Sequence, residues 1–170
     1  MIKFKKLNEN AIIPTKGKEG DAGFDLFTLE DTTIEPRQTI AIPTGMSVQL
    51  EVNQEATIRP RSGISLKGCS SCYSDFATLI TEGIHKGNKE AEYKECSPYL
   101  RVQLGTLDSN YRGDIGIIVY NQEDYDIDIP AKTKLAQMVV GFISTDEVIV
   151  VDELDDSDRG DKGFGSTGVK

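Results

Sequence analysis

Two segments of the chain carry side chains that suit a phosphorylated ligand. In the first, Arg61, Ser62 and Gly63 follow one another directly. Arginine offers a planar fork of N–H donors, serine adds a hydroxyl, and glycine lets a backbone N–H approach an oxyanion closely. In the second, Asp108 begins a turn that also contains Tyr111. A carboxylate in an enclosed pocket can deprotonate a water, and a tyrosine ring can lie against a sugar. Either segment alone could equally be an ordinary surface turn.

Two further positions extend this polar set. Asp25 is flanked by glycine and apolar residues, and it could hold Mg2+ through waters or cap a turn. Gln137 interrupts an apolar run. A buried amide needs hydrogen-bond partners, which are either structural groups or ligand groups.

The C-terminal segment, residues 156–170, has a composition that cannot build a core. It contains four glycines, so we expect it to be mobile until something orders it. A frayed end is the ordinary interpretation of such a tail. This segment also holds the groups needed to clamp a nucleoside triphosphate, namely Arg159, Lys162, Phe164, Ser166 and Thr167.

The segments that must position these residues have the pattern of short strands. Apolar and β-branched runs predict strands at residues 2–7, 39–50, 56–58, 100–107, 115–120, 135–143 and 148–151. Turn signals separate them, and helical periodicity is weak, with 74–84 as the best candidate. Many short strands with frequent turns predict an all-β sandwich or barrel, and 170 residues fit a single domain, 1–170.

Charge and hydropathy exclude several classes of protein. The net charge is −9, from 19 basic and 28 acidic side chains, so a polyanion would be repelled and direct nucleic-acid binding is not expected. The N-terminus lacks the apolar run of a signal peptide, and no stretch approaches the length of a membrane span. We therefore expect a cytoplasmic protein, or one in another reducing compartment, without membrane partners.

Residues 69–99 differ from the rest of the chain and are expected to be an insertion. They are polar, poor in strand signals, and contain all three cysteines and the only histidine. Cys69, Cys72, His85 and Cys96 supply four ligands of the right type for a tetrahedral structural Zn2+ site. A disulfide between two of the cysteines, or free thiols, is the alternative. The insertion could also present a protein-binding surface.

Taken in order, five segments resemble the motifs of the trimeric dUTPase family. These segments are DAGFDL, RPRSGISLKG, LGTLDSNYRGDIG, TKLAQMVV and RGDKGFGSTG. The resemblance runs from about residue 11 to residue 168 and fails only across 69–99. It implies a β jelly-roll homotrimer with active sites at the subunit interfaces. In that arrangement residues 156–170 form a flexible lid over a neighbouring subunit's site.

The resemblance also implies hydrolysis of dUTP to dUMP and pyrophosphate, which supplies dUMP and limits uracil incorporation in DNA. Asp108 would activate the water that attacks the α-phosphorus. Asp25 would lie near an Mg2+ ion held mainly by substrate phosphates and waters. Tyr111 would lie under the deoxyribose and exclude ribose. The other substrate-binding residues implied are Arg61, Ser62, Gly63, Gly105, Gln137, Arg159, Phe164, Gly165, Ser166 and Thr167.

Two other functions compete with this interpretation. A dCTP deaminase of the same fold would need groups that activate water at the cytosine ring, and the segment around Asp108 and Tyr111 fits the diphosphatase pattern better. A binding or regulatory protein would keep the fold and act through 69–99. The intact motif residues argue against a loss of catalysis but do not exclude a second role.

Overall fold

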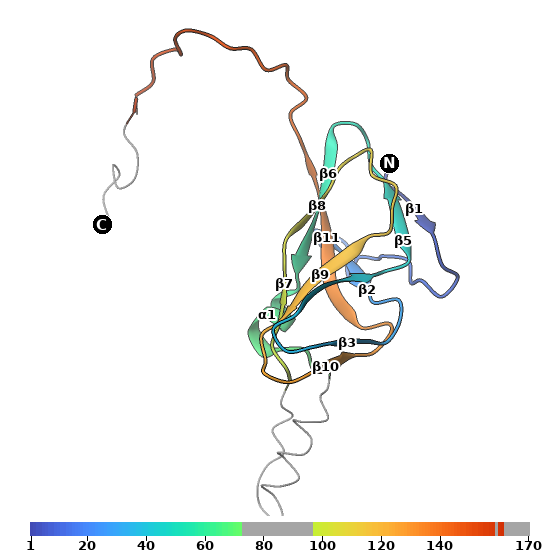
Figure 1. Cartoon of the computed structure of the whole chain (residues 1–170). Helices are drawn as coiled ribbons and strands as arrows, with labels where there is room; N and C mark the ends of the chain where they lie inside the picture. The colour runs from blue at the N-terminus through green and yellow to red at the C-terminus, as the bar shows by residue number, and fades with distance from the viewer. Residues whose placement is uncertain (73–96, 159, 162–170) are drawn as a thin grey trace, which may run out of the picture.

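The computed structural model describes residues 1–72, 97–158 and 160–161. Within these residues the regular secondary structure is almost entirely β (Figure 1). The elements are β1 (Lys3–Lys6), β2 (Gly23–Phe27), β3 (Thr32–Ile34), β4 (Thr39–Pro43), β5 (Met46–Gln49), β6 (Gln54–Pro60), α1 (Ser62–Lys67), β7 (Leu100–Val102), β8 (Gly105–Leu107), β9 (Gly116–Asn121), β10 (Ile127–Ile129) and β11 (Lys134–Phe142). The all-β class predicted from the sequence is confirmed.

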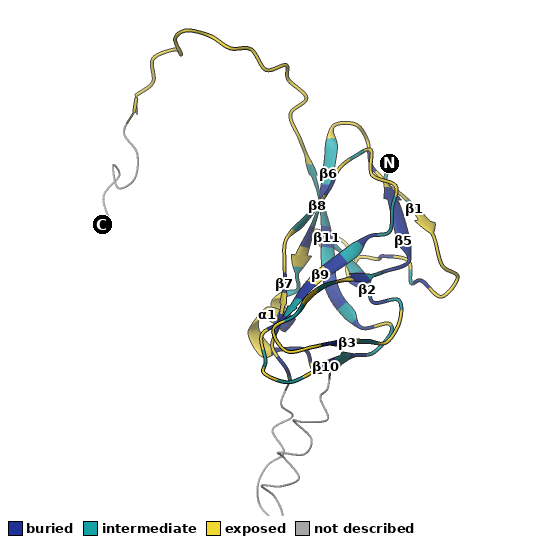
Figure 2. Ribbon diagram, in the orientation of Figure 1, coloured by how far each residue is buried: buried dark blue, intermediate teal, exposed yellow. Residues whose placement is uncertain are grey.

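The strands form antiparallel sheets around one shared hydrophobic core. The largest sheet has the strand order β2-β11-β6-β8, and a second has the order β4-β9-β7. Two further pairs, β1 with β5 and β3 with β10, complete the set. One cluster of buried apolar side chains draws members from every sheet, including Val48, Ile34, Met138 and Ile117. Figure 2 shows the buried residues on the inner strands and the exposed residues on the loops.

Strand β9 shows how the sequence pattern produces a buried face. Ile117, Val119 and Asn121 alternate with outward residues such as Ile118, because successive side chains of a strand point to opposite faces. The buried Asn121 amide donates a hydrogen bond of 2.9 Å to the backbone oxygen of Ile34, which ties β9 to β3. The buried Asn121 side chain therefore has its hydrogen-bond partner in the backbone of β3, and the same bond holds that backbone in place.

Two predicted strands break where the chain must turn. The run at 39–50 divides into β4 and β5 at Gly45, whose φ is 68°. A Cβ at Gly45 would also lie 2.9 Å from Leu29 Cδ1, so the position requires glycine. The run at 100–107 divides into β7 and β8, which join different sheets. The sequence does not predict β2, β3 and β10, since these strands are short and show little alternation.

The predicted strand at 148–151 is wrong. Val148 is 94% exposed and Val150 is 98% exposed, and the segment lies beyond β11, away from the sheets (Figure 1). A β-strand needs a neighbouring strand for its backbone N–H and C=O groups. Within the described residues no strand pairs with this segment.

The short helix α1 was not predicted, and the helix candidate at 74–84 lies outside the described residues. Helix α1 ends at Gly68, which has a φ of 77° and accepts no larger residue, because a Cβ there would lie 2.5 Å from the backbone oxygen of Ser97. No helix within the described ranges is both long enough and apolar enough to cross a membrane.

The expected Zn2+ site is not supported. Cys69 and Cys72 are joined by a disulfide, so their sulfur atoms are not the thiolates that zinc requires. His85 and Cys96 lie outside the described residues. Among the described residues, no group of three or more His, Cys, Asp or Glu side chains could hold a metal ion. The disulfide, left open as the alternative, is the pairing that the structure shows.

We expect one titratable thiol per chain when the protein is denatured without a reductant. The chain has three cysteines, and the Cys69–Cys72 disulfide removes two of them from the count. Titration with a chromogenic disulfide reagent, before and after reduction, measures this number. Three thiols without reduction, accompanied by stoichiometric zinc in elemental analysis, would contradict the disulfide and restore the zinc interpretation.

Candidate active site

A polar pocket of about 370 Å³ lies between β2, β11 and the start of α1. Its lining residues are Gly17, Asp21, Ala22, Gly23, Asp25, Arg61, Ser62, Gly63, Lys134 and Gln137. All the site residues that the sequence indicated in the first, second and fourth motifs therefore lie together. The sequence analysis missed Asp21 and Lys134, which also face this space.

Asp25 is the electrostatic centre of the polar pocket. Its Oδ1 lies 3.2 Å from Arg61 Nε, and its Oδ2 lies 2.9 Å from Lys134 Nζ. The Asp25 side chain is only 16% exposed, whereas both cations are more than a third exposed. The partly buried carboxylate is thus paired on both oxygens, while the cations keep solvent-facing surface on which an anion can bind.

The start of α1 presents backbone donors to the same pocket. No side chain caps the helix at Arg61, so the first N–H groups of the helix have no protein acceptor from a cap. A Cβ placed on Gly63 would meet nothing within 4 Å. This open space beside free N–H groups is suited to a phosphate oxygen, which a larger residue at position 63 would displace.

Gln137 is held at the floor of the pocket by its neighbours. Its Nε2 donates a hydrogen bond of 3.0 Å to the backbone oxygen of Pro60. A Cβ on Gly23 would lie 2.5 Å from Gln137 Oε1, so glycine at position 23 makes room for the amide. The Gln137 side-chain oxygen therefore occupies space beside Gly23 at the edge of the polar pocket. Any residue larger than glycine at position 23 would displace it.

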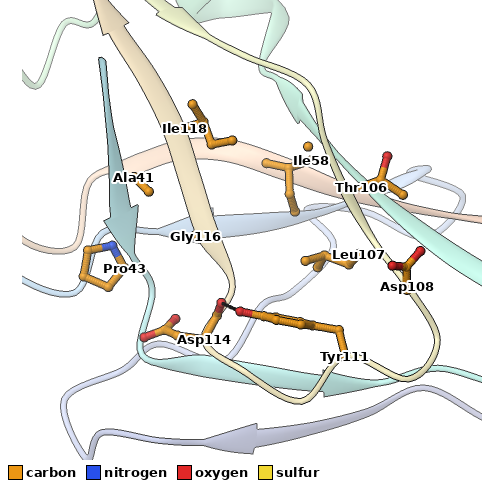
Figure 3. A pocket seen from close by; sticks show the side chains of 11 residues that line it. Ala41, Pro43, Ile58, Thr106, Leu107, Asp108, Tyr111, Asp114, Gly116 and Ile118 are labelled. Carbon is orange, nitrogen blue, oxygen red and sulfur yellow. Dashed lines mark hydrogen bonds between the residues drawn. The ribbon is translucent and has the colours of Figure 1, made fainter. Parts of the chain in front are cut away.

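A second, largely apolar pocket of about 450 Å³ lies beside β8 and β9 (Figure 3). Its lining residues are Ala41, Pro43, Ile58, Gly105, Thr106, Leu107, Asp108, Tyr111, Asp114, Gly116 and Ile118. The third-motif residues indicated by the sequence, Gly105, Asp108 and Tyr111, all lie here. The volume and the mixture of apolar walls with a few polar groups are typical of small-ligand sites.

A tight turn places Asp108 and Tyr111 at the rim of the apolar pocket. The Tyr111 N–H donates a hydrogen bond of 3.1 Å to the Asp108 backbone oxygen. The Tyr111 hydroxyl donates a hydrogen bond of 2.9 Å to the Asp114 backbone oxygen, so the ring lies along the rim between the two aspartates (Figure 3). Asp108 is exposed in this chain and free to face a ligand.

Asp114, which the sequence analysis missed, fastens this turn to the body of the protein. Its Oδ1 accepts hydrogen bonds from the Thr44 N–H and hydroxyl, both at 3.2 Å, and from the Gly45 N–H at 3.0 Å. The Ser47 hydroxyl adds a hydrogen bond of 2.9 Å to the Arg112 backbone oxygen. The partners are about 70 positions apart, so no local sequence signal reveals this contact.

For the dUTP hydrolysis that the motif resemblance implies, we expect Gly113→Ala to reduce kcat/KM by about tenfold, the equivalent of about 1.4 kcal/mol. A Cβ on Gly113 would lie 2.6 Å from Tyr111 Cζ, so the ring must leave its place along the pocket rim. The preference for dUTP over UTP should narrow as well, since the ring is expected to exclude the 2′-hydroxyl. Steady-state kinetics with both nucleotides measures the change. Gly141→Ala is the control, since it lies outside both pockets and a Cβ there would make only ordinary contacts with Glu55. An unchanged preference for dUTP over UTP in Gly113→Ala would contradict the expectation.

The two pockets do not meet within one chain. Cross-strand partners share a face of a sheet, and Gln137 pairs with Asp25 while Ile58 pairs with Gly105 and Met138. Adjacent positions 137 and 138 point to opposite faces, so the polar and apolar pockets open on opposite sides of the sheet. Strands β2 and β8 are also its two edges, about 14 Å apart at three inter-strand spacings.

The polar pocket fits Mg2+ only in company with phosphates. Magnesium takes octahedral oxygen coordination and usually combines one or two carboxylates with waters and substrate phosphates. Asp21 and Asp25 are the carboxylates that line this pocket. In the described part of the chain no third metal-binding group joins them. The remaining residues expected at the site, Arg159, Phe164, Gly165, Ser166 and Thr167, lie outside the described residues.

Comparison with known proteins agrees with this combination of fold and pockets. A deoxyuridine 5′-triphosphate nucleotidohydrolase of Clostridium novyi is 40% identical over 165 residues, covering 97% of this chain and 96% of the relative. The enzyme of the same name from a Picosynechococcus strain is 36% identical and covers 99% of both chains. A solved dUTPase of Staphylococcus bacteriophage 80alpha, with dUPNHPP, matches with a TM-score of 0.76 at 25% identity and 99% coverage of both chains.

The all-β fold with a polar, cation-bearing pocket and a separate apolar pocket suits a nucleotide, and the relatives above make its class that of the nucleotide hydrolases. The model of the dUTPase family matches residues 9–82 and 96–168. With the relatives above, this match shows that the chain belongs to the dUTPase family.

Proposed function

We propose that the chain hydrolyses dUTP to dUMP and pyrophosphate. The observation that carries the proposal is the division of the site into two chemically different pockets. The apolar pocket of about 450 Å³ suits a nucleoside, with Asp108 at its rim. The polar pocket brings together Arg61, Lys134 and the uncapped start of α1, which suit a triphosphate.

The apolar pocket accounts for the choice of nucleoside. Backbone groups along Gly105 to Tyr111 can read the edge of the uracil, while Ile58 and Leu107 supply apolar walls. The Tyr111 ring, fixed through its hydroxyl to the Asp114 oxygen, lies under the deoxyribose and leaves no room for a 2′-hydroxyl. The Tyr111 ring then selects deoxyribose by excluding ribose. The backbone polar groups select uracil, because a different base would leave them without hydrogen-bond partners.

Asp108 acts as the general base. Its carboxylate takes a proton from the water that attacks the α-phosphorus. The new bond from the water oxygen to the α-phosphorus forms as the anhydride bond between the α- and β-phosphates breaks, and pyrophosphate leaves. Arg61, Ser62 and Gly63 bind the phosphate oxygens, and Gln137 orients the water and phosphate network. Bound Mg2+ supplies charge neutralisation of the triphosphate near Asp25. Positioning and neutralisation provide most of the rate enhancement in phosphoryl transfer, so the protein needs little further chemistry.

The complete site requires more than one copy of the chain. The two pockets open on opposite faces of one sheet, so a single triphosphate substrate cannot occupy both in the same protomer. A homotrimer joins the apolar pocket of one protomer to the polar pocket of the next. The apolar side chains of residues 148–151, which are exposed in the single chain, would be buried against a neighbouring protomer in such an assembly. Residues 156–170 then close over a neighbouring site, with Arg159 at the γ-phosphate, Phe164 over the uracil, and Gly165, Ser166 and Thr167 at phosphates.

The test is incubation of the purified chain with Mg2+ and, separately, dUTP, dCTP, dTTP and UTP. Chromatography should show dUMP and pyrophosphate from dUTP alone. Conversion of dCTP to dUTP or dUMP would replace the proposal with a deaminase. If no nucleotide reacted, the motifs would be a surviving scaffold, and function would be sought in residues 69–99.

A second role in protein binding is proposed for residues 69–99. The similar phage 80alpha enzyme is one of the phage dUTPases, which control transfer of virulence genes by a proto-oncogenic G protein-like mechanism. In this chain the Cys69–Cys72 disulfide and the hydrogen bond of 2.9 Å from the Cys69 N–H to the Pro98 oxygen anchor both ends of the segment next to α1. These contacts hold residues 69–72 and Pro98, the described ends of the segment, next to each other, with Cys69 and Cys72 buried in the core.

A further inference from the structure

Lys134 lies in the polar pocket because β11 is irregular at its start. In a regular strand, residues three positions apart point to opposite faces, so Lys134 and Gln137 should not share a pocket. The pairing of β11 with β2 shifts register between Lys134 and Ala136, and both Leu135 and Ala136 are buried. This bulge turns Lys134 to the same side as Gln137 and Asp25. Bulges commonly redirect a side chain next to an active site.

The redirected lysine is held by three contacts. Its Nζ lies 2.9 Å from Asp25 Oδ2 and 5.5 Å from the centroid of the Phe27 ring. The Lys134 backbone oxygen accepts a hydrogen bond of 3.1 Å from Arg61 Nη1. Side chain and backbone of one residue therefore fix both charged partners, Asp25 and Arg61.

A triphosphate changes the balance of charge in this pocket. Phosphate oxygens compete with Asp25 for Arg61, since both are anions that accept from the same guanidinium. Without a second cation, either Arg61 would stay paired with Asp25 and not bind the phosphates, or Asp25 would be left as an unpaired, mostly buried carboxylate. The second arrangement costs free energy. Lys134 removes this conflict because it pairs with the other carboxylate oxygen.

We propose that Lys134 is a positioning residue for triphosphate binding: it retains Asp25 so that Arg61 can turn to the phosphates. The proposal rests on the function proposed above and adds a residue to its phosphate-binding machinery. The ligand class is a di- or triphosphate, because its larger negative charge draws on Arg61 more strongly than a monophosphate does while Asp25 stays paired with Lys134.

The test uses Lys134→Gln, Lys134→Arg and, as a matched control, Lys132→Gln. Lys132 is exposed, lies two positions away outside both pockets, and loses the same charge. We expect Lys134→Gln to raise KM for dUTP, and the Kd for inorganic pyrophosphate measured by calorimetry, each by about tenfold. The Kd for dUMP should change by less than about twofold. Lys134→Arg should restore both values to within about threefold, because an arginine can also pair with Asp25.

Each outcome decides the proposal. It is overturned if Lys134→Gln and Lys132→Gln have the same KM for dUTP and the same Kd for pyrophosphate. It is also overturned if Lys134→Gln weakens dUMP binding as much as pyrophosphate binding. The third contrary outcome is a Lys134→Arg variant that unfolds at the wild-type temperature but binds pyrophosphate as weakly as Lys134→Gln. If Lys134→Gln loses its fold, its unfolding temperature will be lower than that of the wild type. The proposal is then judged on Lys134→Arg, which must bind pyrophosphate with a Kd close to the wild-type value. Failure of the wild type to hydrolyse dUTP overturns the proposed function, whereas the pyrophosphate measurements test Lys134 independently of turnover.

Discussion

Replacing Asp108 with asparagine should lower kcat for dUTP hydrolysis by about 10²–10⁴-fold and leave KM nearly unchanged. The substitution keeps the size of the side chain but removes its ability to accept a proton from water. Asp108 lies at the pocket rim and is exposed, and its backbone oxygen, which Tyr111 uses, is preserved by the substitution. The turn should therefore keep its shape while the chemical step slows.

Single-turnover and steady-state kinetics measure this effect, with Asp126→Asn as the control. Asp126 is also exposed and lies outside both pockets, so that variant removes the same charge away from the site. Equal loss of rate in both variants would point to overall charge, and a fully active Asp108→Asn would assign the base to another group.

Deletion of residues 157–170 should reduce turnover by at least about a hundredfold while the trimer remains folded. Every residue of the described hydrophobic core precedes this segment, so the deletion removes none of them. The lost groups are the arginine, aromatic and hydroxyl side chains expected to enclose the triphosphate. Activity is measured beside circular dichroism and sedimentation of the truncated chain.

A shorter deletion provides the matched control. Removal of Val169 and Lys170 alone leaves the motif RGDKGFGSTG intact and should preserve activity. Full turnover by the longer truncation would exclude the tail from the site.

Mixing the two inactive variants tests whether sites are shared between protomers. Asp108→Asn retains the tail, and the truncated chain retains Asp108. If a site takes these parts from different chains, refolding the two variants together should recover a measurable fraction of wild-type turnover. No recovery from verified mixed trimers would place both parts in one chain.

Several features of the protein were determined by the sequence alone, because their physical causes are local. The alternation along Ile117, Val119 and Asn121 defines a strand with one buried face. The turn from Asp108 to Tyr111 follows from residues that favour turns. The first four motifs identify residues of both pockets, because each motif is a continuous stretch of the chain. Short strands such as β3 and β10 were not predicted, since three residues are too few to show the alternation of a strand.

The tertiary structure decided which of these residues meet. Arg61 and Lys134 are 73 positions apart, and their contact with Asp25 depends on strand register and on a bulge in β11. The contact of Asp114 with Thr44 depends in the same way on the packing of distant segments. The structure also showed that the apolar run at 148–151 has no strand partner within the described chain, and that Cys69 pairs with Cys72. Residue types determine the chemistry that is available, whereas long-range pairing determines which groups share a pocket, because register is a property of two strands and not of either one.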